Sequence, residues 1–139
     1  MHKILVVDDN PASRDLIRAI LKSVPCEIVE AKHGQEALDL IQQERPDLVL
    51  LDIDMPVLDG LSVVRKIRQE PCLADLPVVA VTSFAMQGDQ DKAIAAGFNA
   101  YITKPVRAAT LRQQVQQLLA RALAEKTNGT APCDSRSNR

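Results

Sequence analysis

The stretch Asp47-Leu48-Val49-Leu50-Leu51-Asp52-Ile53-Asp54-Met55-Pro56 decides the fold of this chain. Its apolar residues run without alternation from Leu48 to Leu51, which is typical of a strand buried on both faces of a parallel sheet. Pro56 cannot continue a central strand, so the chain turns there. Asp52 therefore falls at the carboxyl end of the strand, where open α/β sheets bind ligands, and we interpret it as a nucleophile. The alternative is an Asp that merely starts a turn or caps a helix.

Further segments on either side of this stretch each read as a strand: Lys3–Val7, Glu27–Ala31, Val78–Val81 and Ala100–Ile102. Residues at helical spacing follow the strands: Leu16, Ile17, Ile20, Leu21 and Val24, stopped by Pro25; Ala37, Leu38, Leu40 and Ile41; Val63, Val64 and Ile67; the segment Ala85–Ala96, closed by Gly97; and Leu111, Val115, Leu118, Leu119 and Ala122. Strand and helix thus alternate, with a loop expected over residues 71–77. This pattern predicts an α/β fold, a doubly wound five-stranded parallel sheet with helices on both faces. We expect the flavodoxin-like strand order 2-1-3-4-5.

The length of 139 residues suits one domain of ordinary size. We expect this domain over residues 1–124, followed by a disordered polar tail over residues 125–139. The net charge of −1 and the lack of a basic cluster argue against binding to nucleic acid. No apolar run approaches the roughly 20 residues that a membrane span needs, and the chain enters a strand at once, without a signal peptide. The cysteines show no metal or disulfide spacing, which suits reduced thiols in the cytoplasm.

Polar residues follow the strands at the points where they end: Asp8, Asp9, Asp52, Thr82 and Lys104. Each has an ordinary structural explanation: a helix cap for the first two, a turn residue at Thr82, a solvated lysine at Lys104. In a parallel sheet, however, all of them meet at one edge. Carboxylates brought together repel one another unless a cation lies among them, and a set of hard oxygen ligands suits Mg²⁺. An aspartate, a metal, a lysine and a hydroxyl are the parts that phosphoryl transfer to a carboxylate requires.

Short motifs at the ends of the predicted strands, taken together, are specific to one protein family. They are Val6-Val7-Asp8-Asp9-Asn10, Leu51-Asp52-Ile53-Asp54-Met55-Pro56, Asp59-Gly60, Val81-Thr82-Ser83 and Lys104-Pro105. In this order and at strand ends, they make the sequence resemble the receiver domain of two-component response regulators over about residues 2–122. The stretch Val79–Met86 is similar to that of stand-alone, chemotaxis-regulator-like receivers and of the receiver modules of hybrid kinases.

The resemblance implies a role for each site residue. Asp52 would accept a phosphoryl group from the phosphohistidine of a histidine kinase or phosphotransfer protein. Asp9 would bind Mg²⁺ directly, Asp8 would assist through water, and the backbone carbonyl of Asp54 would complete the protein ligands. The remaining roles concern the phosphate: Thr82 and Lys104 would bind it, Tyr101 would be the switch aromatic, and the Lys104–Pro105 peptide bond would be cis. A half-buried tyrosine held for packing is the alternative at Tyr101.

The resemblance also implies an output. Phosphorylation would change the surface around Ala93, Ile94, Ala96, Gly97 and Tyr101, and a downstream protein would dock there. The molecule would be a cytoplasmic bacterial signalling protein rather than a metabolic enzyme, a monomer or a weak homodimer, without nucleic acid or membrane as a partner. Phe84, two residues after Thr82, departs from the residues most common in the family, and we hypothesise that it shields the acyl phosphate and slows its hydrolysis.

Other interpretations compete with this one. A haloacid-dehalogenase-type phosphatase also forms an aspartyl phosphate, and Asp52-Ile53-Asp54 matches its opening motif. Such enzymes carry that motif on the first strand, however, whereas here Asp8-Asp9 comes first. A flavodoxin-like nucleotide or FMN binder would need a glycine-rich phosphate loop after the first strand. A degenerate receiver that only binds partners would not need the complete set of site residues.

Overall fold

The computed structural model of the chain describes residues 2–24, 26–53, 60–73, 76–82, 89–104 and 106–127, without the side chains of residues 72, 89, 90 and 121–127. The strands are β1 (His2–Val7), β2 (Cys26–Ala31), β3 (Leu48–Asp52), β4 (Val78–Thr82) and β5 (Ala100–Thr103). The helices are α1 (Pro11–Leu21), α2 (Gly34–Glu44), α3 (Gly60–Gln69), α4 (Asp89–Ala96) and α5 (Ala108–Thr127), with a short 3-10 helix, η1 (Pro71–Leu73).

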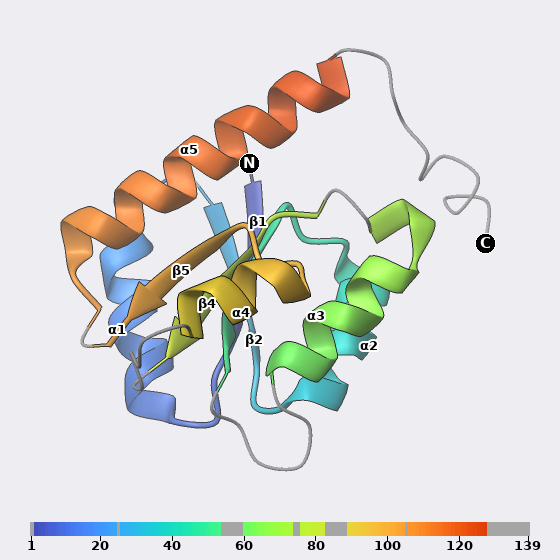
Figure 1. Cartoon of the computed structure of the whole chain (residues 1–139). Helices are drawn as coiled ribbons and strands as arrows, with labels where there is room; N and C mark the ends of the chain where they lie inside the picture. The colour runs from blue at the N-terminus through green and yellow to red at the C-terminus, as the bar shows by residue number, and fades with distance from the viewer. Residues whose placement is uncertain are drawn as a thin grey trace.

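The strands form one parallel sheet in the order β2-β1-β3-β4-β5, which confirms the predicted fold and strand order (Figure 1). β3 lies at the centre, and all its residues are buried. This agrees with its unbroken apolar sequence, because a central parallel strand has helices over both of its faces.

Two apolar clusters cover the two faces of the sheet. Side chains of α1 and α5 pack on one face, and this cluster includes Ile17, Leu21, Leu111 and Val115. Side chains of α2, α3 and α4 pack on the other face, and this cluster is built around Ala37, Ile41, Val63, Val64, Ile67 and Ala93. Successive residues of each strand alternate between these clusters, so both layers of helices are fixed by the same short strands.

The elements differ from the sequence expectation at their ends. α1 stops at Leu21, before Val24, and Leu16 is 46% exposed although it belongs to the predicted apolar set. The apolar set spans a wider arc than the sheet can cover, so one member faces solvent. The expected loop over residues 71–77 begins with η1. α5 runs to Thr127, past the boundary expected at residue 124. Among the described helices, none combines the length and the apolar character that crossing a membrane requires.

Candidate functional site

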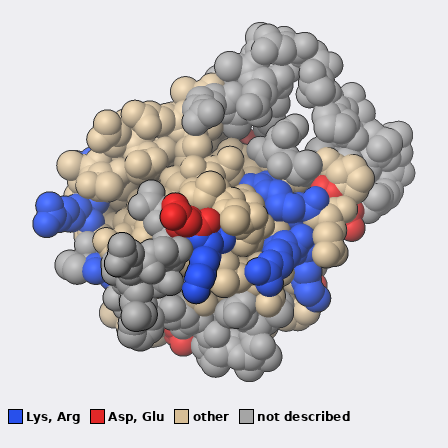
Figure 2. All heavy atoms as spheres, in the orientation of Figure 1, with Lys and Arg blue, Asp and Glu red and all other residues tan. Residues whose placement is uncertain are grey.

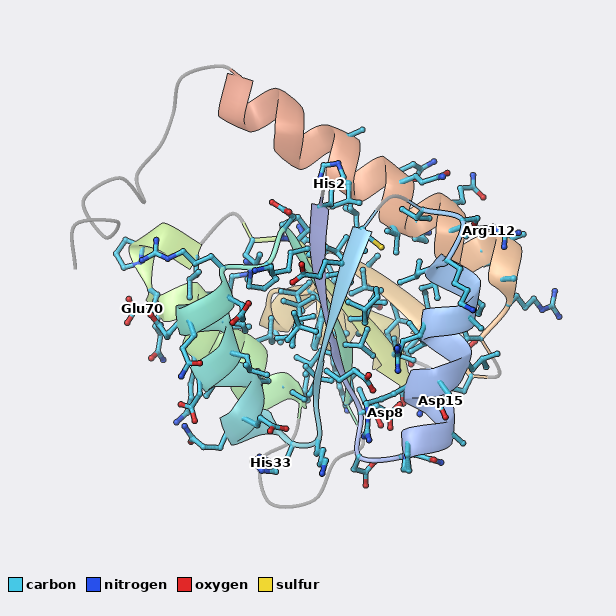
Figure 3. All side chains as sticks on the ribbon, turned by 180° about the vertical axis from the view of Figure 1, so that it is seen from behind. His2, Asp8, Asp15, His33, Glu70 and Arg112 are labelled. Carbon is cyan, nitrogen blue, oxygen red and sulfur yellow. The ribbon has the colours of Figure 1, made fainter. Side chains whose placement is uncertain are left out.

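The register of the sheet brings Asp8 and Asp52 to neighbouring positions at its carboxyl edge. Val7 pairs with Leu51, so the residue that follows each of them lies at the same edge of the sheet. Both aspartates are almost fully buried, Asp8 with 1% and Asp52 with 3% of its surface exposed. In Figure 3, Asp8 lies beside α1, at the opposite end of β1 from His2.

Asp9 completes a cluster of carboxylates with these two residues. One carboxylate oxygen from each of Asp8, Asp9 and Asp52 lies within 4.8 Å of the others. Asp9 is exposed, so one side of the cluster is open to solvent. Hard oxygen donors gathered this closely, with an open side for waters, fit Mg²⁺, which usually takes few protein ligands. The donor set is therefore the one expected of a magnesium site.

Lys104 supplies a positive charge to the same cluster. Its Nζ donates a hydrogen bond to Oδ2 of Asp8 at 3.0 Å and lies 3.5 Å from Oδ2 of Asp52. Burial alone would lower the pKa of Lys104, but the hydrogen bond to Asp8 and the charges of both carboxylates outweigh burial and raise that pKa. Lys104 is therefore a charged, partly buried component of the site and not a solvated surface lysine.

Asp8 and Asp9 do not cap α1. The cap is Asn10, whose Oδ1 accepts a hydrogen bond from the amide of Ala12. Asp8 instead accepts a hydrogen bond from the amide of Asn10 through Oδ1, at 2.9 Å. The capping explanation considered for Asp8 and Asp9 is therefore wrong, because the following residue performs that role.

Thr82 and Tyr101 come from the two strands beyond β3. Asp52 pairs with Val81, so Thr82 lies one step farther toward the carboxyl edge. Thr82 is buried, with 2% of its surface exposed, and its carbonyl accepts a 2.7 Å hydrogen bond from the amide of Lys104. Tyr101 pairs with Ala80 and packs, partly buried, against the cluster under α2, α3 and α4. Its position beneath α4 is compatible both with a switch and with simple packing.

Some predicted features lie outside the described residues. At the site these are the Asp54 carbonyl as a metal ligand, the cis bond before Pro105, and Phe84 as a shield of the acyl phosphate. The helix start expected at Ala85 and the part of the expected tail from residue 128 onward lie outside them as well. They remain predictions.

The structure adds residues that the sequence analysis did not identify. Arg14 of α1 is buried and contacts Asp8, and Glu30 of β2 pairs with it. A signal was present in the sequence: Arg14 precedes Ile17 by three residues and Leu21 by seven, so it lies on the buried face of the helix. An arginine at such a position requires a partner inside the fold.

Comparison with known proteins gives a consistent result. Residues 4–116 match the family described as response regulator receiver domain. The polar-differentiation response regulator DivK of Brucella anthropi is 35% identical over 86% of this chain and 97% of its own length.

Solved structures agree with the sequence comparison. The receiver domain of a sensor histidine kinase from Pseudomonas aeruginosa PAO1, crystallised with a magnesium ion coordinated in its active-site cleft, is 34% identical. It aligns with a TM-score of 0.78 over 86% of this chain and 98% of its own. A CheY-like receiver domain protein from Methanospirillum hungatei is 29% identical and aligns with a TM-score of 0.82 over 90% of this chain and 98% of its own.

Proposed function

The chain belongs to the response regulator receiver domain family, whose members are signalling modules in two-component systems. From this family membership, we propose that the protein is a single-domain response regulator of a phosphorelay. Asp52 accepts the phosphoryl group. The observation that carries the proposal is the buried Asp52 carboxylate, grouped with Asp8 and Asp9 and paired with Lys104. A haloacid-dehalogenase-type phosphatase is not favoured, since the family match and the sheet order are those of receivers.

The donor is a phosphohistidine on a histidine kinase or a phosphotransfer protein. A carboxylate oxygen of Asp52 attacks the phosphorus, a P–O bond forms, and the P–N bond to the imidazole breaks. The leaving imidazole takes up a proton from solvent. Hydrolysis later restores the carboxylate when water attacks the same phosphorus and inorganic phosphate leaves. Such a transfer depends mainly on positioning and on neutralisation of charge.

Asp9 and Asp52 would hold Mg²⁺, with Asp8 assisting and the Asp54 carbonyl completing the protein ligands. When bound, the ion would neutralise charge on the phosphoryl oxygens. Asp8 is held ready by hydrogen bonds to both of its carboxylate oxygens, from the amide of Asn10 and from Nζ of Lys104. These contacts fix the orientation of the Asp8 carboxylate, and efficient transfer depends on such positioning.

Phosphorylation then redistributes contacts at the edge of the sheet. Lys104, now paired with Asp8 and Asp52, would bind one phosphoryl oxygen, and the Thr82 hydroxyl would donate to another. Full reversal of a two-state switch needs roughly 5 kcal/mol of discrimination, and hydrogen bonds to charged groups contribute about 1.5–3 kcal/mol each. Two or three such bonds are enough. Tyr101 would follow Thr82 and alter the surface of α4 and β5.

The altered surface would dock a downstream protein. The face shown in Figure 2 carries basic and a few acidic side chains on largely uncharged surface, and the net charge of −1 for the whole chain favours a protein partner over the phosphate backbone of nucleic acid. The protein would act in the cytoplasm, where histidine kinases use ATP, as a monomer or a weak homodimer.

The test is phosphorylation by acetyl phosphate with Mg²⁺, followed by intact-mass measurement. We expect the wild type to gain one phosphoryl group and Asp52→Asn to gain none. Asp15→Asn, which removes an exposed carboxylate of α1, is the matched control and should be labelled like the wild type. An unlabelled wild type, or a labelled Asp52→Asn variant, would contradict the proposal.

A further inference from the structure

Arg14 is a buried arginine of α1 that contacts the main chain of Asp8, a residue of the proposed magnesium site. It has 8% of its surface exposed and lies on α1, on the face turned toward the sheet. A buried guanidinium is costly unless both its charge and its hydrogen-bond donors are satisfied. The partners that satisfy it lie on β2 and at the end of β1, so Arg14 joins three elements at the edge of the sheet.

The first partner of Arg14 is the main chain of a metal-ligand candidate. Nη1 donates a 2.5 Å hydrogen bond to the carbonyl oxygen of Asp8, and this contact is buried. Asp8 lies just beyond the end of β1, where a buried carbonyl must find a donor outside the strand ladder. Its amide is also fixed, because it donates to the carbonyl of Ala31 at 3.1 Å. Together with the bonds to its carboxylate, Asp8 is held at its amide, its carbonyl and both carboxylate oxygens.

The second partner compensates the charge. Nε of Arg14 donates a 2.9 Å hydrogen bond to Oε1 of Glu30. The other carboxylate oxygen of Glu30 lies 3.2 Å from Nη1 of Arg18, one helical turn farther along α1. The planar guanidinium can serve Asp8 and Glu30 at once because its donors point in fixed, separate directions. The charge of Arg14 is therefore paired with Glu30, and its contact with the candidate site is the hydrogen bond to the Asp8 main chain.

We propose that Arg14 is a positioning residue for the magnesium site, acting through the Asp8 main chain. This inference rests on the proposed function. Without Arg14, the buried carbonyl of Asp8 loses its donor, the turn after β1 relaxes, and the Asp8 carboxylate moves away from those of Asp9 and Asp52. Residues that support metal ligands in this way typically account for 10- to 100-fold in metal affinity.

The test is Mg²⁺ affinity measured by isothermal titration calorimetry in the absence of any phosphodonor. We expect Arg14→Met to bind Mg²⁺ roughly tenfold more weakly than the wild type. Arg68→Met is the matched control. Arg68 of α3 also donates from its guanidinium to main-chain carbonyls, those of Gly97 and Leu73, but at the amino end of β4. Its loss should lower stability and leave Mg²⁺ affinity within about twofold of the wild type, because distant sites that share no partners behave independently.

Two further measurements separate positioning from general destabilisation. Arg14→Lys keeps the charge opposite Glu30 but presents one nitrogen, which cannot reproduce the Nε and Nη1 pair. We expect it to fold like the wild type and still to bind Mg²⁺ more weakly. Hydrogen exchange of the Asn10 amide, which bonds to the Asp8 carboxylate, should accelerate in the metal-free Arg14 variants and not in Arg68→Met.

The outcomes are distinct. Wild-type Mg²⁺ affinity in both Arg14 variants would overturn the inference and leave the proposed function intact. Equal losses in Arg14→Met and Arg68→Met would also overturn it, because the effect would then be global. A wild type that binds no Mg²⁺ would overturn the proposed function itself.

Discussion

Lys104 places one positive charge against two buried carboxylates, those of Asp8 and Asp52. Replacing it with Met would leave both carboxylates without this cation in the metal-free protein. Hydrogen bonds to charged groups are worth about 1.5–3 kcal/mol, so we expect Lys104→Met to lose stability of this order at pH 7. Urea denaturation in the presence of a chelator measures the loss.

The pH dependence of that loss follows from the raised pKa of Lys104, which exceeds its usual value of 10.5. A cationic group whose pKa is raised by folding stabilises the fold fully below its unfolded pKa, and this contribution disappears as the pH rises through the folded pKa. The difference in stability between wild type and Lys104→Met should therefore be constant from pH 7 to about 10 and shrink above that. A difference that already shrinks near neutral pH would contradict the assigned charge state.

At this scale the sequence indicated most of the candidate site, because each of its main residues ends a strand, as Asp52 and Thr82 do, or comes within two residues of a strand end, as Asp8, Asp9 and Lys104 do. Asp8, Asp52 and Thr82 could be placed together once the sheet was taken as parallel. Arg14 and Glu30 could not, since they come from a helix and a neighbouring strand whose facing sides are fixed only by packing. The periodicity that places Arg14 on the buried face marks it as unusual, but it does not identify the Asp8 carbonyl as its partner.

At the scale of elements, Gly60 determines how closely α3 approaches the site. A Cβ at this position would lie 2.8 Å from the carbonyl oxygen of Asp52 and 2.8 Å from Cα of Ile53. Both are main-chain atoms of the strand end and its continuation, so neither can rotate away. Ala usually stabilises a helix relative to Gly, but here we expect Gly60→Ala to cost about 1–3 kcal/mol, as overpacking does. It should also displace Asp52 and slow phosphorylation by acetyl phosphate up to roughly 100-fold.

Gly97→Ala is the control for Gly60→Ala. Gly97 has φ +125°, and a Cβ added to it would lie 2.8 Å from Cγ of Arg68. Its replacement should also destabilise the fold, but at the amino end of the sheet, so the folded protein should be phosphorylated at the wild-type rate. If Gly60→Ala is phosphorylated as quickly as Gly97→Ala, the close approach of α3 does not position Asp52.

The elements themselves were largely predictable, and their ends were not. The sequence located every strand to within a residue or two. β3 and β4, which are buried throughout, leave an unbroken apolar pattern. The end of α1 at Leu21 and the exposure of Leu16 depend on how far the sheet extends beneath the helix, which periodicity does not reveal. α5 continues to Thr127 because nothing in Ala124-Glu125-Lys126-Thr127 breaks a helix, although the polar composition suggested a tail.

At the scale of the whole molecule, the helices are not equally anchored. α3 buries Val63, Val64 and Ile67, whereas Ala93 is the one buried residue among the described side chains of α4. Elements with few buried apolar contacts open at a lower cost in free energy than the rest of a fold. α4 also lies beside β5, which carries Tyr101 and leads to Lys104 (Figure 1). We therefore expect a conformational change at the site to displace α4 and β5 at a lower cost in free energy than the other elements.

Phosphorylation should consequently act on the molecule unevenly. We expect amide NMR shifts on addition of acetyl phosphate and Mg²⁺ to be largest, beyond the site itself, over Asp89–Ala96 and Ala100–Thr103, and small over Gly34–Glu44 of α2. Thr82→Ala, phosphorylated to the same extent, should keep the shifts around Asp52 and lose most of those in α4 and β5, because the coupling hydroxyl is gone. Equal shifts in α2 and α4, or undiminished shifts in Thr82→Ala, would mean that the signal does not pass through Thr82 to the weakly anchored helix.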